Sequence, residues 1–516
     1  MSGARENKAY NDEEELQNPT GADFKHNKIQ ANKNAGTYKA LKVRKSVGIL
    51  GGVSLIVGTM IGSGIFASSS PVFANAGSAG MSMLIWSFCG VLVLLISLCY
   101  VELGTMIPRS GGEYHYLREA FGNVPVFLLV FSSAVLLRPA GLAAVLLTTG
   151  NYLTEVFFPG ECNDIRTKLL LSKVLAALFL GIIVFVNCAS VRWATSVQVI
   201  FTATKLLAIV MLIITGFVRL GQGHNDSLKD AFNGTSKSIS DIGYAFYGGL
   251  WAYDGWNNLN YVTEELKNPI RDLPLAIMIG IPLVTACYVM VNITYLTVLT
   301  SIQIASSKAV AVTLANQLYG VMAWVIPVFV ACSTFGAANG SAFTSGRLVY
   351  VSAREGHMPK LLAMVHTKRH TPLPALIFTC IIAWIMLIPE SSNFSTLVNY
   401  FNFAAWTFYG GTVAALLWLR IRQPDLERPY KVFIGIPIVV LLCSLYLVIA
   451  PFYDYPLQSL YCLLFILFGI PVYFLFVKYQ VFPKAITTGF GSFVDKITYK
   501  IQMLCDLSMP DDFDED

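Results

Sequence analysis

The chain has 516 residues, of which 55% are hydrophobic and 13% are charged, and its mean hydropathy is +0.59. Soluble domains carry about 25% charged residues, so this composition nearly excludes a water-soluble enzyme. The net charge of +5 is small for this length and gives no support to nucleic-acid binding, and the abundance of apolar residues excludes disorder except at the ends. We therefore expect a polytopic, all-α integral membrane protein.

The predicted elements begin after residues 1–46, which are polar throughout and therefore contain no cleavable signal peptide. We interpret this segment as a disordered cytosolic tail. A helix needs about 20 mostly apolar residues to cross a bilayer. Residues 47–481 contain twelve such candidate spans. They cover 47–74, 80–107, 124–157, 169–189, 194–219, 240–264, 273–299, 318–352, 373–389, 394–420, 430–452 and 456–481. The remaining 482–516 form a cytosolic tail, in which 484–504 is either an interfacial helix or disordered.

The orientation follows from the positions of Lys and Arg. With the N-terminus in the cytosol, 27 of the 36 basic residues fall on the inner side and 6 fall in outer loops. Because basic residues favour the cytosolic side of membrane proteins, both termini are expected in the cytosol.

The first predicted span is interrupted by Gly62 and Gly64, which flank Ser63. Each glycine lowers helix stability by about 1 kcal/mol, and non-helical backbone at membrane depth is tolerated only where it lines a cavity or is buried in protein. The freed amides of Ser63 and Gly64 would then suit a carboxylate. The alternative is a packing seam of small residues, which Gly58 and Gly62 also fit.

On the predicted outer side, Cys162 is the one cysteine, in the loop after the third span. Eight other cysteines lie in apolar runs. A lone cysteine in an oxidising compartment has no partner in its own chain, which favours an intermolecular disulfide. An idle thiol is the alternative.

A second interruption, residues 248–257, lies five spans after the first and contains Trp251, Asp254 and Asn257. Broken helices at corresponding positions of two inverted halves are typical of LeuT-like transporters with a 5+5 repeat. An intramembrane carboxylate such as Asp254 usually faces a partner or a water-filled cavity. It therefore either pairs with Lys205 or Arg138 as internal support or receives a cationic group of a substrate.

Several motifs resemble the amino acid–polyamine–organocation superfamily, and within it the light subunits of heteromeric amino acid transporters, most closely the b(0,+) type. The resemblance runs from about residue 44 to residue 483. Its motifs are Gly62–Phe66, Tyr100–Gly104, Ser110–Tyr114, Gly249–Asn257, Leu259–Tyr261, Thr263–Leu266, Ala337–Gly340, Arg354–His357 and Asn399–Trp406.

The resemblance implies how a substrate would bind. Its carboxylate would meet the backbone of the first break, which spans Gly62, Ser63, Gly64 and Ile65, and its α-amino group would meet carbonyls near Met60, Ile61 and Trp251. Trp251 matches an aromatic gate. Asp254 matches the acidic position that distinguishes the b(0,+) type from neutral-only relatives. Asn257 matches a polar residue of the pocket. Asn402 and Tyr409 are candidates for the end of the pocket that holds the substrate side chain.

The resemblance also implies two further roles. Lys205 matches a lysine whose ammonium lies where sodium-coupled relatives bind an ion, so it acts as a sodium-site substitute. Cys162 matches the cysteine that forms a disulfide with a single-span heavy-chain glycoprotein, called rBAT for the b(0,+) type.

We accordingly expect a sodium-independent exchanger of the plasma membrane, apical in an epithelium by resemblance, that imports cationic amino acids and cystine and exports neutral ones. The alternatives are an exchanger of neutral amino acids only and a receptor or channel-like protein on the same scaffold. No enzyme activity, cofactor or metal site is expected, since no nucleophile–base set is recognisable and the six histidines are scattered. The sequons at Asn225 and Asn233 are expected to be unused. Residues 507–511 differ from the Val-Pro-Pro found near the C-terminus of b(0,+) members.

Overall fold

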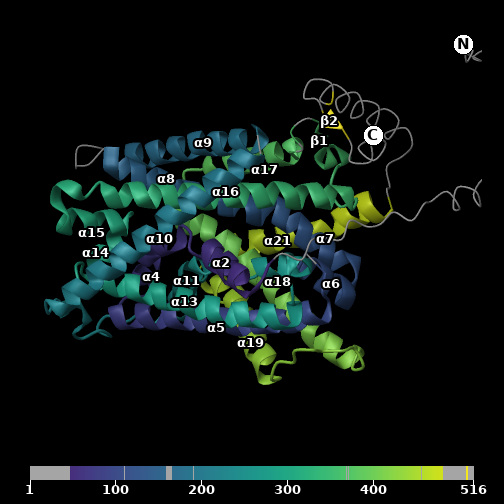
Figure 1. The fold of residues 1–516 in the computed structure, drawn as a ribbon, viewed down its shortest axis with the longest axis horizontal. Coiled ribbons are helices and arrows are strands. Elements are labelled where there is room, and N and C mark those ends of the chain that lie inside the picture. The colour runs from purple at the N-terminus through teal and green to yellow at the C-terminus, as the bar shows by residue number, and fades with distance from the viewer. Residues whose placement is uncertain are drawn as a thin grey trace, which may run out of the picture. The chain divides into compact units, whose positions relative to one another are not determined.

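The structure is a computed structural model that describes residues 47–109, 111–157, 165–189, 191–367, 369, 371–454, 456–479, 502 and 507–508. The expected tail 1–46, Cys162 and nearly all of the segment 484–504 lie outside these residues. The described part is mainly helical (Figure 1).

The helices, in chain order, are α2 (Ile49–Met60), α3 (Gly64–Ala67), α4 (Ser69–Ala76), α5 (Ala79–Met106), α6 (Glu113–Phe121), α7 (Asn123–Ser132), α8 (Arg138–Phe157), α9 (Ile165–Ala189), α10 (Val191–Gly221), α11 (Ile239–Ala252), α12 (Asn258–Tyr261), α13 (Pro269–Leu296), α14 (Ser301–Ser306), α15 (Val310–Leu318), α16 (Val325–Arg354), α17 (Leu373–Leu387), α18 (Phe394–Arg422), α19 (Gly435–Ile449), α20 (Pro451–Asp454) and α21 (Pro456–Val472). Short 3₁₀ turns are Asp226–Leu228, Thr263–Glu265, Gly320–Met322 and Lys360–Ala363, and π-helical turns are Ser133–Leu137 and Tyr473–Lys478.

Nine helical segments of the described chain are long and apolar enough to cross a membrane. They are Ile49–Ala67, Ala79–Met106, Asn123–Glu155, Arg166–Ala189, Ile200–Gly221, Pro269–Leu296, Gly320–Arg354, Gly435–Tyr453 and Pro456–Lys478. Each coincides with one of the predicted spans, so the expectation of a polytopic, membrane-embedded helical protein is confirmed. The other three predicted spans correspond to α11 and α17, which are short, and to α18, which is long but more polar.

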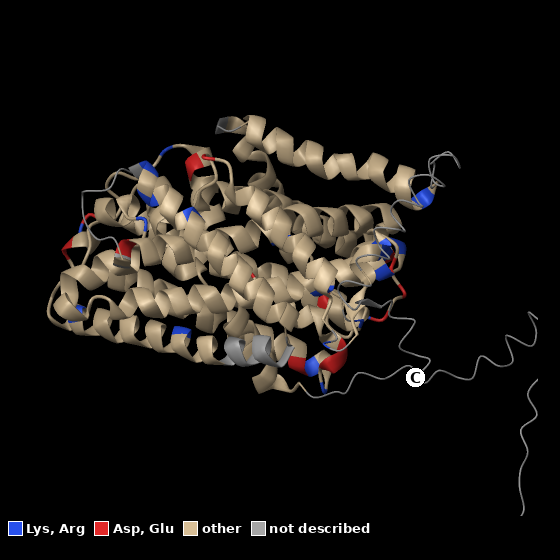
Figure 2. Cartoon of the chain, turned by 90° about the horizontal axis from the view of Figure 1, so that it is seen from above, with Lys and Arg blue, Asp and Glu red and all other residues tan. Residues whose placement is uncertain are grey.

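Peripheral helices expose their apolar side chains. On α9, Leu170, Leu178 and Phe185 are all more than half exposed, and only 28% of the most apolar stretch of this helix is buried. Such a surface is stable where the surrounding medium is hydrocarbon rather than water. Lys, Arg, Asp and Glu lie mostly toward the ends of the long helices (Figure 2).

One buried ion pair joins distant segments. Glu102, near the end of α5, is fully buried and accepts two hydrogen bonds from the Arg420 guanidinium, at 2.8 and 2.5 Å. The backbone amide of Val432 donates to the same carboxylate at 2.8 Å. These contacts fasten the end of α18 and the following loop to α5, and removing one partner would leave an uncompensated buried charge.

A two-stranded antiparallel pairing joins β1 (Val365–His366) and β2 (Leu507–Ser508). Val365 pairs with Ser508, and His366 pairs with Leu507. Leu507 and Ser508, the first two residues of the segment that departs from the Val-Pro-Pro pattern, therefore pair with the loop between α16 and α17.

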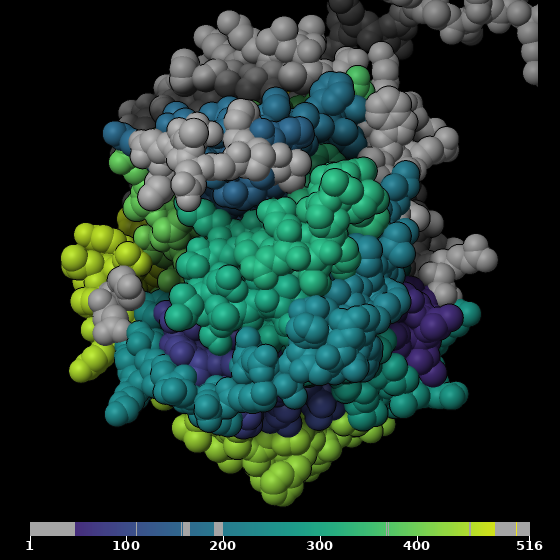
Figure 3. Space-filling model, turned by 90° about the vertical axis from the view of Figure 1, so that its left-hand side faces the viewer, coloured from purple at the N-terminus to yellow at the C-terminus, as the bar shows by residue number. Residues whose placement is uncertain are grey.

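Figure 3 shows the end of the helix bundle at which α14 and α15 lie. The surface of residues near 310–330 covers the middle of this face. The Oγ of Ser70, in α4, donates to the carbonyl of Ala305 at 2.9 Å, so α14 is held against the second half of the first broken helix.

Candidate functional site

Both expected helix interruptions are present. Helix α2 ends at Met60, Ile61 is extended with φ −71° and ψ 92°, and helix α3 begins at Gly64. Helix α11 ends at Ala252, and residues 253–257 form turns before α12, with Gly255 in the left-handed region at φ +97°. The glycines thus stand where the chain leaves helical geometry, as their low helix propensity predicts.

The two breaks lie against each other. A Cβ atom on Gly64 would stand 2.3 Å from the Cα of Ala252, which is closer than any real contact, so only glycine fits there. The hydroxyl of Thr59 donates to the carbonyl of Gly255 at 3.2 Å. The close approach therefore falls on Gly64 and not on Gly58, where a Cβ would meet nothing within 4 Å, or on Gly62, where it would make an ordinary contact with Ala337.

A tyrosine that the sequence analysis missed ties the two breaks together. The hydroxyl of Tyr288, on α13, lies 2.6 Å from the carbonyl oxygen of Met60 and 2.8 Å from that of Ala252. These are the last carbonyls of α2 and α11, and Tyr288 is fully buried. The single hydroxyl proton is thus shared between the two helix ends, whose carbonyls would otherwise be unsatisfied acceptors at this depth.

Some backbone amides of the first break donate to protein carbonyls and others do not. The amides of Phe66 and Ala67 both donate to the carbonyl of Ser63, at 3.1 and 3.0 Å. In the described part of the chain, the amides of Ser63 and Gly64 form no hydrogen bond to a backbone acceptor. Two adjacent donors at a helix N-terminus suit an anionic group.

A cavity of about 390 Å³ adjoins both breaks, a volume within the range of small-molecule sites. It is lined by Ser54, Leu55, Gly58, Thr59, Met60, Gly62, Ser63, Gly64, Leu137, Arg138, Gly141, Val145, Thr202, Lys205, Trp251, Ala252, Asp254, Gly255, Asn258, Ala337, Gly340, Ser341, Phe343, Thr344 and Phe401. The structure therefore brings together Met60, Gly62, Ser63, Gly64, Trp251, Asp254 and Lys205 from the predicted set.

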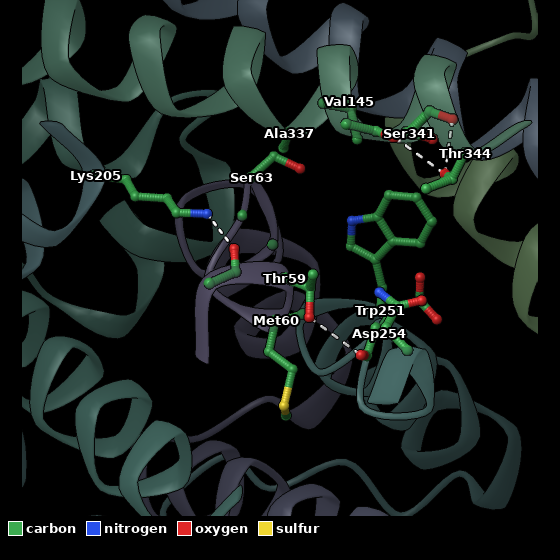
Figure 4. Close-up of a pocket in the computed structure, with 18 of the residues that line it drawn as sticks. Thr59, Met60, Ser63, Val145, Lys205, Trp251, Asp254, Ala337, Ser341 and Thr344 are labelled. Atoms are coloured by element: carbon green, nitrogen blue, oxygen red, sulfur yellow. Dashed lines mark hydrogen bonds between the residues drawn. The ribbon is translucent and has the colours of Figure 1, made fainter. Parts of the chain in front are cut away.

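Trp251 lies between this cavity and a second one. Its ring packs edge-on against Phe401, which lines the first cavity, with 4.8 Å between the ring centroids. On the other side it meets Phe394 at 6.2 Å, and Phe394 lines a cavity of about 360 Å³ that opens between α4, α8 and α14. Figure 4 shows the indole of Trp251 projecting toward Val145, Ser341 and Thr344.

Asp254 lies in the second break and contributes its carboxylate to the cavity. Its Oδ1 accepts a long hydrogen bond of 3.3 Å from the hydroxyl of Tyr409, on α18. Within the described chain, no Lys or Arg nitrogen lies within 4 Å of Asp254, so the internal salt bridge to Lys205 or Arg138 is not formed here. The carboxylate is therefore left without a direct cationic partner.

Lys205, on α10, is buried and points at the first break (Figure 4). Its Nζ donates to the carbonyl oxygen of Gly58, which is the residue before Thr59 on α2. The ammonium thus supplies a fixed positive charge beside the broken part of the first span.

Other predicted site residues do not reach the cavity. Ile61 and Ile65 are buried in the core beside it. The side-chain amide of Asn257 donates instead to the Glu113 carboxylate at 2.6 Å. The next residue, Asn258, lines the cavity in its place. Asn402 donates to the carbonyls of Tyr247 and Val398, at 3.1 and 3.0 Å.

The sequence analysis also did not predict that residues of α16 line the cavity. Ala337, Gly340, Ser341 and Thr344 line the cavity on one face of this helix. The hydroxyl of Thr344 donates to the carbonyl of Gly340, four residues earlier, at 3.0 Å. Because Ser and Thr bond in this way in many helices, the sequence carries no signal that separates them from ordinary packing residues.

A comparison with known families and proteins gives a consistent result. The model of the family described as "Amino acid permease" matches residues 48–477. The chain is 48% identical over 475 residues to b(0,+)-type amino acid transporter 1 of Mus musculus, covering 92% of this chain and 95% of the relative. Its identity to the Homo sapiens protein of the same name is 47% over 476 residues, with the same coverage. It is 44% identical over 475 residues to large neutral amino acids transporter small subunit 2 of Rattus norvegicus, covering 92% of this chain and 87% of the relative.

Proposed function

The chain belongs to the amino acid permease family and is an amino acid transporter of the membrane, and on that premise we propose that it is a sodium-independent exchanger. It imports cationic amino acids and cystine and exports neutral amino acids. The observation that carries this proposal is the carboxylate of Asp254, which shares one cavity with the free amides of Ser63 and Gly64.

The proposed architecture has twelve membrane spans arranged as a 5+5 inverted repeat, with both termini in the cytosol. The breaks after Met60 and Ala252 support it, because they interrupt the first and sixth proposed spans. The expected destination is the plasma membrane, at the apical side of an epithelium.

An amino acid bound in the cavity meets complementary groups at each end. Its carboxylate binds the amides of Ser63 and Gly64. Its α-ammonium donates to backbone carbonyls near the ends of α2 and α11. The Tyr288 hydroxyl is hydrogen-bonded to the carbonyls of Met60 and Ala252 there and fixes their positions. A guanidinium or ammonium on the substrate side chain reaches Asp254, which Tyr409 orients. Asn257 and Asn402 act as supports of the backbone around the site rather than as contacts.

The state described here is closed on the outer side. With the N-terminus in the cytosol, Ser54, Leu55 and Thr344 lie in the inner halves of their helices, so the first cavity opens inward. Lys168 and Glu155, which line the second cavity, lie at the outer ends of theirs. Trp251 and its two phenylalanine neighbours separate the cavities, as a gate in alternating access would.

Sodium independence follows from Lys205. Its ammonium donates to the carbonyl of Gly58. The resemblance implies that a sodium-coupled relative would bind its ion at the position of this ammonium. A second cation beside this fixed charge is electrostatically disfavoured.

The proposed partner is a single-span heavy-chain glycoprotein of the rBAT kind, bound through a disulfide from Cys162. The support is the position of Cys162 in the only cysteine-bearing outer loop of the expected topology, together with a relative named a "small subunit".

Exchange is tested by trans-stimulation in vesicles that contain the chain and candidate heavy chains. Uptake of labelled arginine is expected to rise when the vesicles are preloaded with leucine and to be unchanged when sodium is replaced by choline. Equal uptake into empty and loaded vesicles would favour the channel-like alternative. Leucine–leucine exchange without arginine transport would favour the neutral-only exchanger, which the similarity to a large neutral amino acids transporter makes the second candidate.

A further inference from the structure

One cationic side chain in the cavity has no role in the site as described so far. Arg138, the first residue of α8, is half-buried and lines the same cavity as Asp254. In the described chain its guanidinium forms no ion pair, since none of the carboxylate oxygens lies within 4 Å of its nitrogens. It interacts with Asp254 electrostatically across the cavity.

The backbone around Arg138 is unusual. The π-helical turn Ser133–Leu137 ends directly before it, and Pro139 follows it. The amide of Arg138 donates to the carbonyl of Ser133, five residues earlier. A π-turn inserts one extra residue into a helix, and such turns are rare and frequent at functional sites.

The cavity lining carries two cations and one carboxylate, and one of the two cations is held away from that carboxylate by a hydrogen bond. The three ionisable residues of the lining are Lys205, Asp254 and Arg138. The Lys205 ammonium is committed to the carbonyl of Gly58, so Arg138 is the cation left to compensate the Asp254 carboxylate. This matters most for a neutral substrate, which brings no side-chain charge of its own.

Given the exchange function proposed above, we propose that Arg138 is a specificity-determining residue that competes with the substrate for Asp254. When a neutral amino acid occupies the cavity, the Arg138 guanidinium neutralises the carboxylate. When a cationic amino acid enters, its side-chain cation takes the carboxylate and Arg138 turns toward the water of the cavity. One site thereby accepts both substrate classes without leaving a carboxylate uncompensated in a partly dehydrated space.

Arginine suits this role physically. Its long side chain carries five donors in a planar fork and is more weakly hydrated than an ammonium, so it approaches or leaves a carboxylate at low cost. A lysine would keep the charge but not the two-point contact.

The test is a comparison of two substrates in Arg138→Gln. Removing the competing cation is expected to lower the KM for arginine and to raise the KM for leucine, each by about fivefold, the factor that corresponds to about 1 kcal/mol for a solvent-accessible ion pair. Arg138→Lys, which keeps the charge but loses the two-point contact, is expected to shift both KM values in the same directions as Arg138→Gln but by less. Arg422→Gln is the matched control, because Arg422 stacks on Trp418 at the end of α18, outside the cavity, and its loss should leave the ratio unchanged.

The double variant Asp254→Asn/Arg138→Gln separates electrostatics from folding. With both charges gone, leucine exchange is expected to return to near the wild-type KM, even if Arg138→Gln alone is poorly expressed. Arginine should also protect purified Arg138→Gln against thermal unfolding more than it protects the wild-type protein, a readout that does not depend on transport.

Three results would overturn the proposal: equal losses for arginine and leucine in Arg138→Gln, which would indicate a contact with the substrate carboxylate; an unchanged ratio of the two KM values; or no recovery of leucine exchange in the double variant. If wild-type protein fails to exchange arginine for leucine, the proposed function itself is wrong, which is a different outcome from a wild-type exchanger whose selectivity ignores Arg138.

Discussion

The substitution Asp254→Asn removes a charge from the cavity and nearly preserves the shape of the side chain. Asp254 makes one long hydrogen bond, from Tyr409 at 3.3 Å, and has no cation within 4 Å in the described chain. No internal ion pair is therefore broken, and the fold should tolerate the change. The carboxamide oxygen can still accept the Tyr409 hydrogen bond.

The expected effect falls on cationic substrates. A hydrogen bond to a charged group contributes about 1.5–3 kcal/mol, and because the cavity opens to water we take the lower end, which corresponds to about a tenfold loss in affinity. Uptake of labelled arginine and leucine is measured over a concentration series in vesicles with equal amounts of transporter. The KM for arginine should rise about tenfold, whereas the KM for leucine should change little.

The wild-type protein and Asp254→Glu, which keeps the charge on a longer side chain, serve as controls. Equal losses for arginine and leucine at matched protein levels would refute the selectivity role. Such a result would instead indicate that Asp254 supports the structure around the second break.

Three further substitutions test other parts of the account. Gly64→Ala should reduce the amount of folded protein and abolish exchange of all substrates, because its Cβ would overlap the backbone of Ala252; near-normal thermal unfolding and uptake would contradict the close packing of the breaks. Lys205→Ala should impair transport without making it sodium-dependent, because the vacancy lacks a built set of oxygen ligands, and sodium-stimulated uptake in the wild-type protein would contradict the assigned role. Cys162→Ser should abolish the high-mass band on a non-reducing gel, and persistence of that band would show that another residue forms the link.

The positions of the helix breaks were predictable because they depend on local backbone preferences. Glycines at 62, 64 and 255 destabilise the helix whatever surrounds them, and the helices end at Met60 and Ala252 beside them. Hydrophobic length likewise predicted the apolar spans. These properties belong to short stretches of sequence, so they survive without knowledge of the packing.

The direction of each side chain was less predictable. Asn257 ends the turn of the second break and Asn258 begins α12, and only the fold decides that Asn258 faces the cavity while Asn257 bonds to Glu113. The rotation of α18 similarly turns Asn402 toward the carbonyl of Tyr247. Tyr288 went unnoticed because one tyrosine in an apolar helix looks like a core residue until both of its acceptors are known.

The most direct test of the central claim is a cryo-EM map of the heavy-chain complex in a lipid nanodisc, recorded with and without saturating arginine. The account predicts additional density in the cavity between the breaks, with the carboxylate at the amides of Ser63 and Gly64 and the guanidinium at Asp254. Arginine density confined to the outer cavity beside Glu155 and Lys168, or its absence from both cavities, would contradict the assignment of this cavity as the transport site.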